Sequence, residues 1–139
     1  MKIRIYYEDT DAAGIVYYVN YLKFCERARS EPFFEAGRSP QEGAGYFVVK
    51  SVQAEYLRSA KLGDLVEVRT RMVEKRSASI VLYQTVVKEE EVLFAMTIRL
   101  AYLREGRPAK IPTEIYSLLS SWEKTDGSSE DVSGSGSSS

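Results

Sequence analysis

The chain has 139 residues, of which 44% are hydrophobic and 28% charged, a composition typical of one soluble domain with an apolar core. The formal net charge is −1, and without the three acids of residues 125–139 the rest of the chain carries +2, far from the strongly basic profile of a nucleic-acid binder. The sequence shows neither the roughly 20-residue apolar run of a membrane span nor a signal peptide, so we expect no integral membrane segment and a cytoplasmic location.

Residues 2–7, KIRIYY, alternate apolar and polar side chains and predict a short strand. Asn20 is the expected N-cap of a helix that follows, and Gly37 is its expected end. Between Tyr17 and Gly37 the apolar residues recur at spacings of three and four, which predicts one long helix with an apolar stripe of Tyr21, Phe24, Cys25, Ala28, Pro32 and Ala36.

Pro32 lacks a backbone N–H and clashes with the preceding turn, so we expect a kink near Ser30, or a second helix that starts with Ser30 as its cap. Cys25 lies in the apolar stripe, which indicates a packed core cysteine rather than a nucleophile. Because the sequence holds no other cysteine, an intrachain disulfide and a cysteine-built metal site are excluded.

After a loop with Gly43 and Gly45, the residues up to 104 repeat with a period of two and predict four antiparallel strands. The first is expected to present on one face Val48, Val52, Ala54 and Tyr56. The second follows a Gly63-Asp64 turn and should present together Val66, Val68, Thr70 and Met72. The third and fourth, SIVLYQTVVK and VLFAMTIRLAYL, flank a polar turn at 88–91. Thr113 is the expected cap of a last short helix with Leu118, Leu119 and Trp122.

This order of elements predicts an α+β fold in which a curved antiparallel sheet wraps around one long central helix. A single helix cannot cover both faces and edges of such a sheet, so we expect pairing with a second chain. Residues 1–124 form the predicted domain. Residues 125–139, TDGSSEDVSGSGSSS, are expected to form a disordered Ser/Gly-rich tail because they offer almost nothing that could pack.

Asp9 and Asp11 stand just before the predicted helix. Acids at such a place commonly cap a helix or form a turn, and stabilise it by roughly 0.5–2 kcal/mol. A divalent metal would need more carboxylates or histidines, and we expect no metal site. Alternatively, the unpaired N–H groups of the helix start polarise a carbonyl while an aspartate attacks it or activates water. Histidine-dependent triads are excluded because the sequence has no histidine, and a weak base such as aspartate requires a reactive carbonyl such as a thioester.

The stretch YYEDTDAAGIVYYVNYLKFCERAR contains the run T-D-x-x-G-x-V-Y-x-x-x-Y and resembles the 4-hydroxybenzoyl-CoA thioesterase-like hotdog family. It is most similar to the acyl-CoA thioesterases associated with the Tol–Pal system. EYLRSAKLGDLVEV and KRSASIVLY match the strands of that family in order and spacing, so the resemblance covers roughly residues 2–105.

The resemblance implies a hotdog fold, and a homodimer or a homotetramer of two dimers with the acyl thioester bound at the dimer interface. Asp11 matches the catalytic carboxylate, as nucleophile or general base. The backbone N–H of Tyr18 matches the carbonyl-polarising donor, and Gly14 is expected to allow close chain approach between them. Tyr17 is expected to contact the substrate. For Asp9, which matches a more variable position, the turn-forming role stands.

Many relatives of the Tol–Pal type carry histidine where this sequence has Tyr18. The proposed role uses the backbone, so hydrolysis stays plausible, but a side-chain proton donor to the departing thiolate is removed. The phosphates of coenzyme A need cations, and the family has basic residues around two strand junctions. At these junctions this sequence has Arg58 and Lys61, and then Lys75, Arg76 and Ser77. As isolated charges, such residues are more often simply solvated.

The expected function is hydrolysis of an acyl-coenzyme A to a carboxylate and free coenzyme A, with no bound cofactor. The alternative is a non-catalytic acyl-thioester-binding or scaffold protein on the same fold. A hydratase on this fold is disfavoured because such enzymes generally use a histidine. The acyl group, whether aromatic, short or long, stays open.

Overall fold

A computed structural model describes residues 1–11, 13–16, 18–38 and 45–123 of the chain. Tyr17, Gly43 and the 125–139 tail, on which the sequence analysis makes predictions, lie outside the described residues. The elements run in chain order as β1 (Lys2–Arg4), a 3₁₀ helix (Tyr7–Asp9), α1 (Val19–Glu35), β2 (Gly45–Tyr56), β3 (Leu65–Lys75), β4 (Ser79–Lys88), β5 (Glu91–Arg104), β6 (Arg107–Pro108), α2 (Thr113–Leu118) and a second 3₁₀ helix (Ser120–Trp122).

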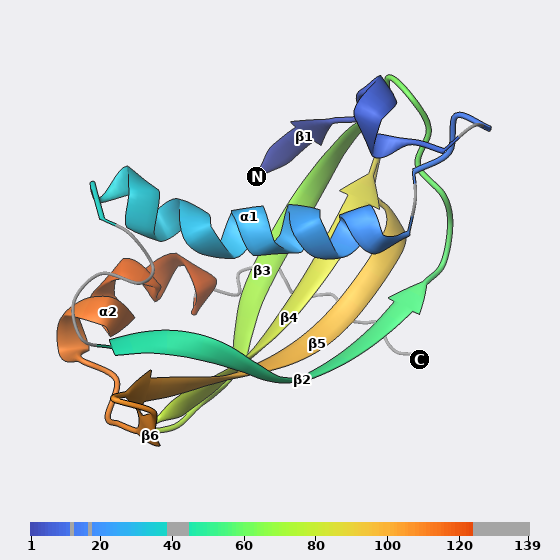
Figure 1. Cartoon of the computed structure of the whole chain (residues 1–139). Helices are drawn as coiled ribbons and strands as arrows, with labels where there is room; N and C mark the ends of the chain where they lie inside the picture. Colours follow the sequence, from blue (N-terminus) through green and yellow to red (C-terminus); the bar gives the residue numbers. More distant parts are fainter. Residues whose placement is uncertain (12, 17, 39–44, 124–139) are drawn as a thin grey trace.

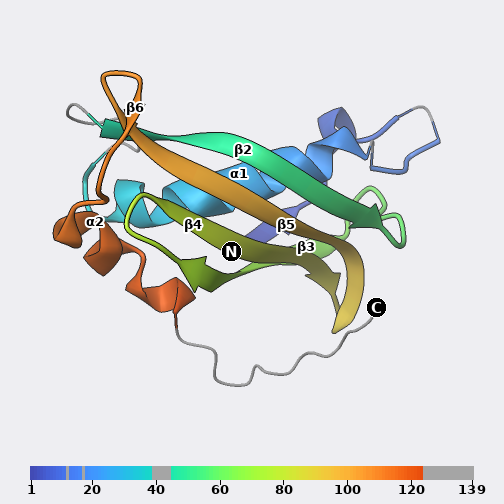
Figure 2. The same cartoon turned by 90° about the horizontal axis from the view of Figure 1, so that it is seen from below.

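The strands form one antiparallel sheet in the order β1-β3-β4-β5-β2, and the short β6 pairs with the end of β5. α1 lies across the concave face of this sheet (Figure 1). In the view from below, the curved strands lie in front of α1 (Figure 2). The predicted α+β fold, with a curved sheet around one long helix, is confirmed.

The core lies between α1 and the central strands. Tyr21, Phe24, Cys25 and Ala28 of the predicted stripe are all buried. They face alternate residues of the sheet that are equally inaccessible, among them Leu82, Phe94, Met96 and Ile98. Burying each large apolar side chain stabilises the fold by roughly 1.5–3 kcal/mol. Cys25 is fully buried, which confirms its prediction as a core residue, and this burial raises the pKa of its thiol to about 12.

One polar side chain lies fully buried within this core. Gln84 of β4 donates from Nε2 to the carbonyl of Cys25 at 3.1 Å and to Oγ1 of Thr70 at 3.0 Å. Its Oε1 accepts a hydrogen bond from Arg29 Nη1 at 3.0 Å. Because an unpaired buried amide would be costly, these bonds fix the position of α1 on β3 and β4.

α1 is continuous through Pro32, so the predicted second helix starting at Ser30 is wrong. Ser30 Oγ instead donates to the carbonyl of Glu26 within the same helix. The proline removes one backbone hydrogen bond, which the buried side chains on either side of it offset. Gly37 ends the helix as predicted, at φ 75°, a value that favours glycine.

Two predicted caps are wrong. α1 begins at Val19 and Tyr18 precedes it, so Asn20 lies inside the first turn and its side chain bonds elsewhere. α2 begins at Thr113 after Pro112, and the hydroxyl of Thr113 makes no cap hydrogen bond. Pro112 supplies a fixed φ before the helix, and α2 is held by buried Ile115 and the buried Leu119 and Trp122 that follow it.

The predicted face of β2 is wrong at one residue. The pairing of β2 with β5 shifts between Val49 and Ser51, where an extra residue bulges out of the strand. Val52, Ala54 and Tyr56 therefore face α1, opposite the inward-facing residues of β5, whereas Val48 faces the other side. The corresponding prediction for β3 is confirmed. Val66 lies opposite buried Ile3 of β1, and the other three residues lie on the same face, opposite the buried Val86, Gln84 and Leu82 of β4.

β2 is the last strand in the described sheet, and much of its inner face is uncovered. Val49 is 51% exposed, Val52 45% and Tyr56 44%, although their β5 partners are buried. A long edge strand with exposed apolar side chains is a surface on which another strand can pair.

Candidate functional site

The Asp11 turn, which here means residues 11 and 13–16, lies in the chain between the first 3₁₀ helix and α1. The Asp11 side chain is exposed, and its Oδ1 accepts a hydrogen bond from the backbone N–H of Ala13 at 2.9 Å. The Asp11 carbonyl accepts from Gly14 N–H at 3.0 Å, and the Asp11 N–H donates to the Ile15 carbonyl at 3.0 Å. These bonds close the turn and hold the carboxylate in a defined place at the surface.

Gly14 is required in this turn for a reason other than the expected close chain approach. Its φ is +78°, in the left-handed region that other residues rarely adopt. Within the described chain, no heavy atom would lie within 4 Å of an added Cβ. As far as the described residues show, the glycine therefore shapes the turn and does not make room for a neighbour.

Asp9 forms a turn, as expected. Its side chain is only 8% exposed, and Oδ2 accepts a hydrogen bond from the N–H of Tyr6 at 3.0 Å. This bond starts the 3₁₀ helix Tyr7–Asp9, so the predicted strand over 2–7 ends at Arg4. Asp9 is thus occupied in fixing the backbone just before Asp11.

The start of α1 lies directly after the Asp11 turn. Tyr18 precedes the first helical residue, and its ring packs edge-to-face on that of Tyr56 at a centroid distance of 5.1 Å. The peptide dipoles of an α-helix add up to a partial positive charge at its N-terminus. A carbonyl oxygen placed at this helix end would be polarised.

The loop after β2, residues 57–64, packs against the Asp11 turn. Ile15 forms a bridge with Lys61, and the Leu62 N–H donates to the Gly14 carbonyl at 3.0 Å. The hydroxyl of Tyr21 accepts from Ala60 N–H at 2.7 Å and donates to the Arg58 carbonyl at 3.2 Å. Burial raises the pKa of the Tyr21 hydroxyl, which keeps it a donor. The fold therefore brings the 57–64 loop, with Arg58 and Lys61, beside the turn that carries Asp11.

Arg58 and Lys61 both have exposed side chains. Arg58 Nε lies 2.5 Å from Glu91 Oε2, and the two side chains are 69% and 51% exposed. An exposed ion pair contributes little to stability, so the guanidinium can exchange its partner for a phosphate at small cost.

Arg76 and Ser77 lie elsewhere, in the hairpin between β3 and β4. Arg76 pairs with Glu74, the Tyr116 hydroxyl donates to the Arg76 carbonyl, and the Ile111 N–H donates to the Ser77 carbonyl at 2.8 Å. The 11 residues of β3, at roughly 3.3 Å each, separate this hairpin from the 57–64 loop by roughly 30 Å or more. A single chain does not bring these two residues to Asp11.

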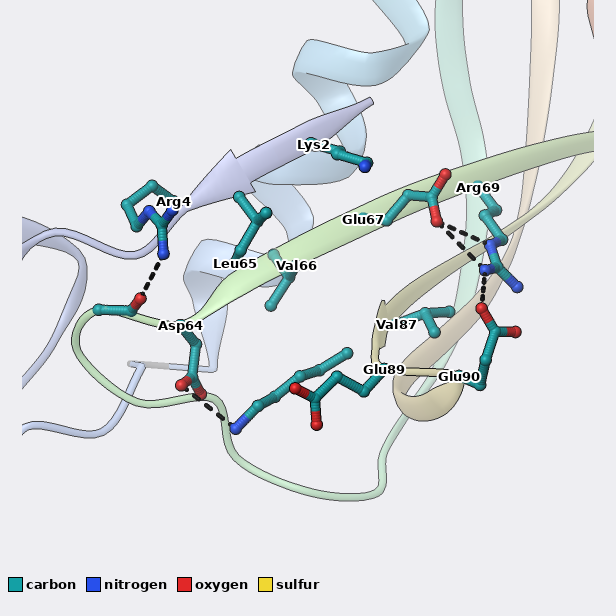
Figure 3. A pocket seen from close by; sticks show the side chains of 12 residues that line it. Lys2, Arg4, Asp64, Leu65, Val66, Glu67, Arg69, Val87, Glu89 and Glu90 are labelled. Atoms are coloured by element: carbon teal, nitrogen blue, oxygen red, sulfur yellow. Dashed lines mark hydrogen bonds and ion pairs between the residues drawn. The ribbon is translucent and has the colours of Figure 1, made fainter.

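A hollow of about 500 Å³ lies beside β1, β3 and the β4–β5 turn and reaches the end of the 57–64 loop at Gly63 and Asp64, but none of the predicted site residues lines it (Figure 3). Its charged side chains are largely paired with one another. Arg69 lies 3.1 Å from Glu67 and 2.8 Å from Glu90, and Lys88 lies 3.2 Å from Asp64. The Arg69 guanidinium lowers the pKa of the Glu90 carboxyl. Mutually paired charges leave little to attract a ligand.

Two residues at the site were not predicted to act there, Asn20 and Tyr21. From the sequence, Asn20 is the expected helix cap and Tyr21 belongs to the expected apolar stripe. Neither role reveals what the polar groups of these two side chains bind. Asn20 binds the carbonyl of Asp9 and Tyr21 binds the backbone of the 57–64 loop, and the tertiary fold sets both partners.

Among the residues that the structure describes, no three side chains of the metal-binding types His, Cys, Asp and Glu gather in one place. No helix in the described ranges has both the length and the apolarity to cross a membrane.

Known proteins are similar to this chain over most of its length. The model of the thioesterase superfamily matches residues 13–95, a stretch that contains Gly14, Tyr18 and the 57–64 loop and begins after Asp11. An acyl-CoA thioesterase YbgC of Helicobacter pylori (strain J99) is 38% identical over 131 residues, covering 86% of this chain and 98% of that protein. The acyl-CoA thioesterase YbgC of Haemophilus influenzae is 37% identical, over 81% of this chain and 88% of that protein.

A solved structure described as a probable thioesterase from Bartonella henselae superposes with a TM-score of 0.72 at 30% identity, covering 81% of this chain and 97% of that one. The resemblance read from the sequence is confirmed, and with it the hotdog fold. The chain belongs to the thioesterase superfamily.

Proposed function

We propose that this protein is an acyl-CoA thioesterase that hydrolyses R–CO–S–CoA with water to a carboxylic acid and free coenzyme A. The two relatives described above, which align with this chain over 98% and 88% of their own length, are named as acyl-CoA thioesterases. The observation that carries the proposal is the exposed Asp11 carboxylate in a turn that leads into the start of α1. The carboxylate accepts a hydrogen bond from the Ala13 N–H, and the Asp11 backbone makes two more bonds within the turn.

In the proposed reaction, the backbone N–H of Tyr18 polarises the thioester carbonyl and stabilises the oxyanion that forms on it. Asp11 either attacks the carbonyl carbon, giving an anhydride that water then hydrolyses, or takes a proton from the attacking water. In both routes the C–S bond breaks and the coenzyme A thiolate leaves. The chemistry uses water, a carboxylate and backbone donors, so it requires no bound cofactor.

The complete site is proposed to form in a homodimer that pairs through β2. Its exposed apolar residues, Val49, Val52 and Tyr56, favour a second copy as the cover for this edge. β2 begins at the end of the sheet where the β3–β4 hairpin lies, because Val48 and Ser79 both pair with Ala101. A two-fold antiparallel β2–β2 pair would therefore bring the hairpin of one copy to the Asp11 end of the other.

This arrangement accounts for cationic residues at both ends of the sheet. Arg58 and Lys61 would bind the phosphates of coenzyme A together with Arg76 and Ser77 of the partner subunit. Tyr17 is proposed to contact the acyl or pantetheine part of the substrate. If the protein is a homotetramer rather than a homodimer, two such dimers would associate to form it. Because acyl-coenzyme A is an intracellular metabolite, the reaction is proposed to take place in the cytoplasm.

The test is release of free thiol from a panel of aromatic, short-chain and long-chain acyl-coenzyme A substrates. We expect saturable turnover with at least one of them, and the preferred member identifies the acyl group. A protein that only binds acyl thioesters would show heat of binding by calorimetry without thiol release, and that result would replace hydrolysis with the binding or scaffold function.

A further inference from the structure

Two side chains of the first turn of α1 form hydrogen bonds with the backbone of other segments of the chain. Asn20 Nδ2 donates to the carbonyl of Asp9 at 2.8 Å. The next residue, Tyr21, bonds through its hydroxyl to the backbone of Arg58 and Ala60. The first contact joins α1 to the last residue of the 3₁₀ helix Tyr7–Asp9, and the second joins α1 to the 57–64 loop.

The Asn20 bond holds the chain on one side of Asp11. The acceptor carbonyl belongs to Asp9, two residues before Asp11, and the Asp9 carboxylate is itself bound to the N–H of Tyr6. The entry to the Asp11 turn is thus fixed to the same helix turn that follows Tyr18.

The Tyr21 bond holds the chain on the other side. Tyr21 binds the N–H of Ala60, and the Ala60 carbonyl accepts from the N–H of Val16 at 2.9 Å. Val16 and Ile15 close the turn on Asp11, through the bridge from Val16 to Thr10 and the bond from the Asp11 N–H to the Ile15 carbonyl. The exit of the turn is thereby fixed to α1 as well.

We propose that Asn20 and Tyr21 are positioning residues that set the Asp11 carboxylate against the N-terminus of α1; this inference rests on the proposed thioesterase function. One helix turn then supplies the carbonyl-polarising donors and also holds the two ends of the turn that carries the carboxylate. Catalysis depends on such placement, since a displacement of about 1 Å costs on the order of a hundredfold in rate.

Packing alone does not account for the polar ends of these side chains. α1 is anchored by Phe24, Cys25 and Ala28, which are buried against the sheet. The Tyr21 ring stacks on Phe94 at 5.2 Å, a contact that phenylalanine would retain. What the Tyr21 hydroxyl adds is the hold on the 57–64 loop.

The test compares Asn20→Ala and Tyr21→Phe with Ser30→Ala, which deletes another side-chain hydrogen bond of α1 far from the Asp11 turn. Rates are measured at a temperature where circular dichroism shows every variant folded. For Asn20→Ala we expect kcat to fall about tenfold or more with KM within about twofold, because only the carboxylate is displaced. For Tyr21→Phe we expect kcat to fall and KM for acyl-coenzyme A to rise, because the loop with Arg58 and Lys61 is released too. Ser30→Ala should keep wild-type kinetics.

A second measurement separates positioning from a merely structural effect. In the Asp11→Asn background, Asn20→Ala should lower the residual rate no further, because a residue that acts through Asp11 has nothing left to position. Full additivity of the two losses, or wild-type kcat in Asn20→Ala and Tyr21→Phe while Asp11→Asn is inactive, would overturn this inference alone. Absence of thiol release by the wild-type protein would overturn the proposed function and this inference with it.

Discussion

The backbone N–H of Val16 donates a hydrogen bond to the carbonyl of Ala60 at 2.9 Å, and both residues are buried. This bond joins the turn that presents Asp11 to the loop that presents Arg58 and Lys61. Half of the predicted site is therefore assembled within one chain as a connected unit. The other half, Arg76 and Ser77, lies at the far end of β3, so the proposed site needs a second copy of the chain.

The dimer proposed through β2 predicts that a charge on its inner face separates the two copies. Val52→Glu places a carboxylate at a side chain that is 45% exposed in one chain, so it costs the single chain little. At a β2–β2 interface the same carboxylate would be buried without a partner, at several kcal/mol. We expect light scattering at micromolar concentration to change from dimer to monomer, with loss of thiol release.

Val73→Glu is the matched control for this variant. Val73 is also 45% exposed, but it lies at the β3 bulge and away from β2. The Val73→Glu variant should have the same oligomeric state and the same rate of thiol release as the wild type. A wild-type protein that is a stable, active monomer would rule out the interface site.

The proposed phosphate contacts predict a substrate-dependent effect of Arg58→Ala. Loss of a charge-assisted hydrogen bond to phosphate should raise KM for acyl-coenzyme A about tenfold, with kcat within about twofold. An acyl-pantetheine substrate lacks the nucleotide phosphates, so its KM should not change. Arg69→Ala, which removes another exposed and ion-paired arginine outside the proposed site, is the control. Equal losses on both substrates would assign Arg58 to structure.

Burial of Cys25 predicts a pH-dependent term in stability. In the unfolded chain the thiol ionises near its ordinary pKa of 9.0, whereas the folded state holds the proton up to about 12. Below about pH 9 the thiol is protonated in both states, and its contribution to the free energy of unfolding is complete. As the pH rises from 9 toward 12, the thiol ionises in the unfolded chain but not in the folded one, so this contribution is lost.

We therefore expect the urea midpoint to fall between pH 8.5 and 10.5, and to fall less in Cys25→Ala. An aromatic disulfide reagent should label the thiol only after unfolding. Rapid labelling of the native protein at pH 8, or equal pH slopes for the two proteins, would contradict the burial of this thiol.

Most of the fold is predictable from local patterns. The spacing of Tyr21, Phe24 and Ala28 predicts the buried helix stripe, and the period of two predicts all four long strands. The predicted face of β2 is wrong because one extra residue in the strand changes the direction of the side chains that precede it. The bulge between Val49 and Ser51 turns Val48 to the opposite face, and a period of two cannot reveal an added residue.

The site is predictable only in part. The T-D-x-x-G run identifies Asp11 and Gly14 because it is continuous in sequence. The contacts of Asn20 and Tyr21 depend on which loops the fold brings to the first turn of α1, and no local pattern encodes that. The same limit applies to Arg76, whose distance from Asp11 follows from the direction of β3.

The central claim is that the Asp11 carboxylate carries the reaction, and the most direct test is thiol release by Asp11→Asn beside Asp9→Asn. The substitution at Asp11 keeps size and shape but removes the charge, so we expect kcat to fall by a factor of about a hundred or more while acyl-coenzyme A still binds. Asp9→Asn weakens the bond to Tyr6 and should lower the melting temperature before it lowers the rate. Wild-type turnover by Asp11→Asn at matched folding, or a larger loss in Asp9→Asn, would contradict the mechanism.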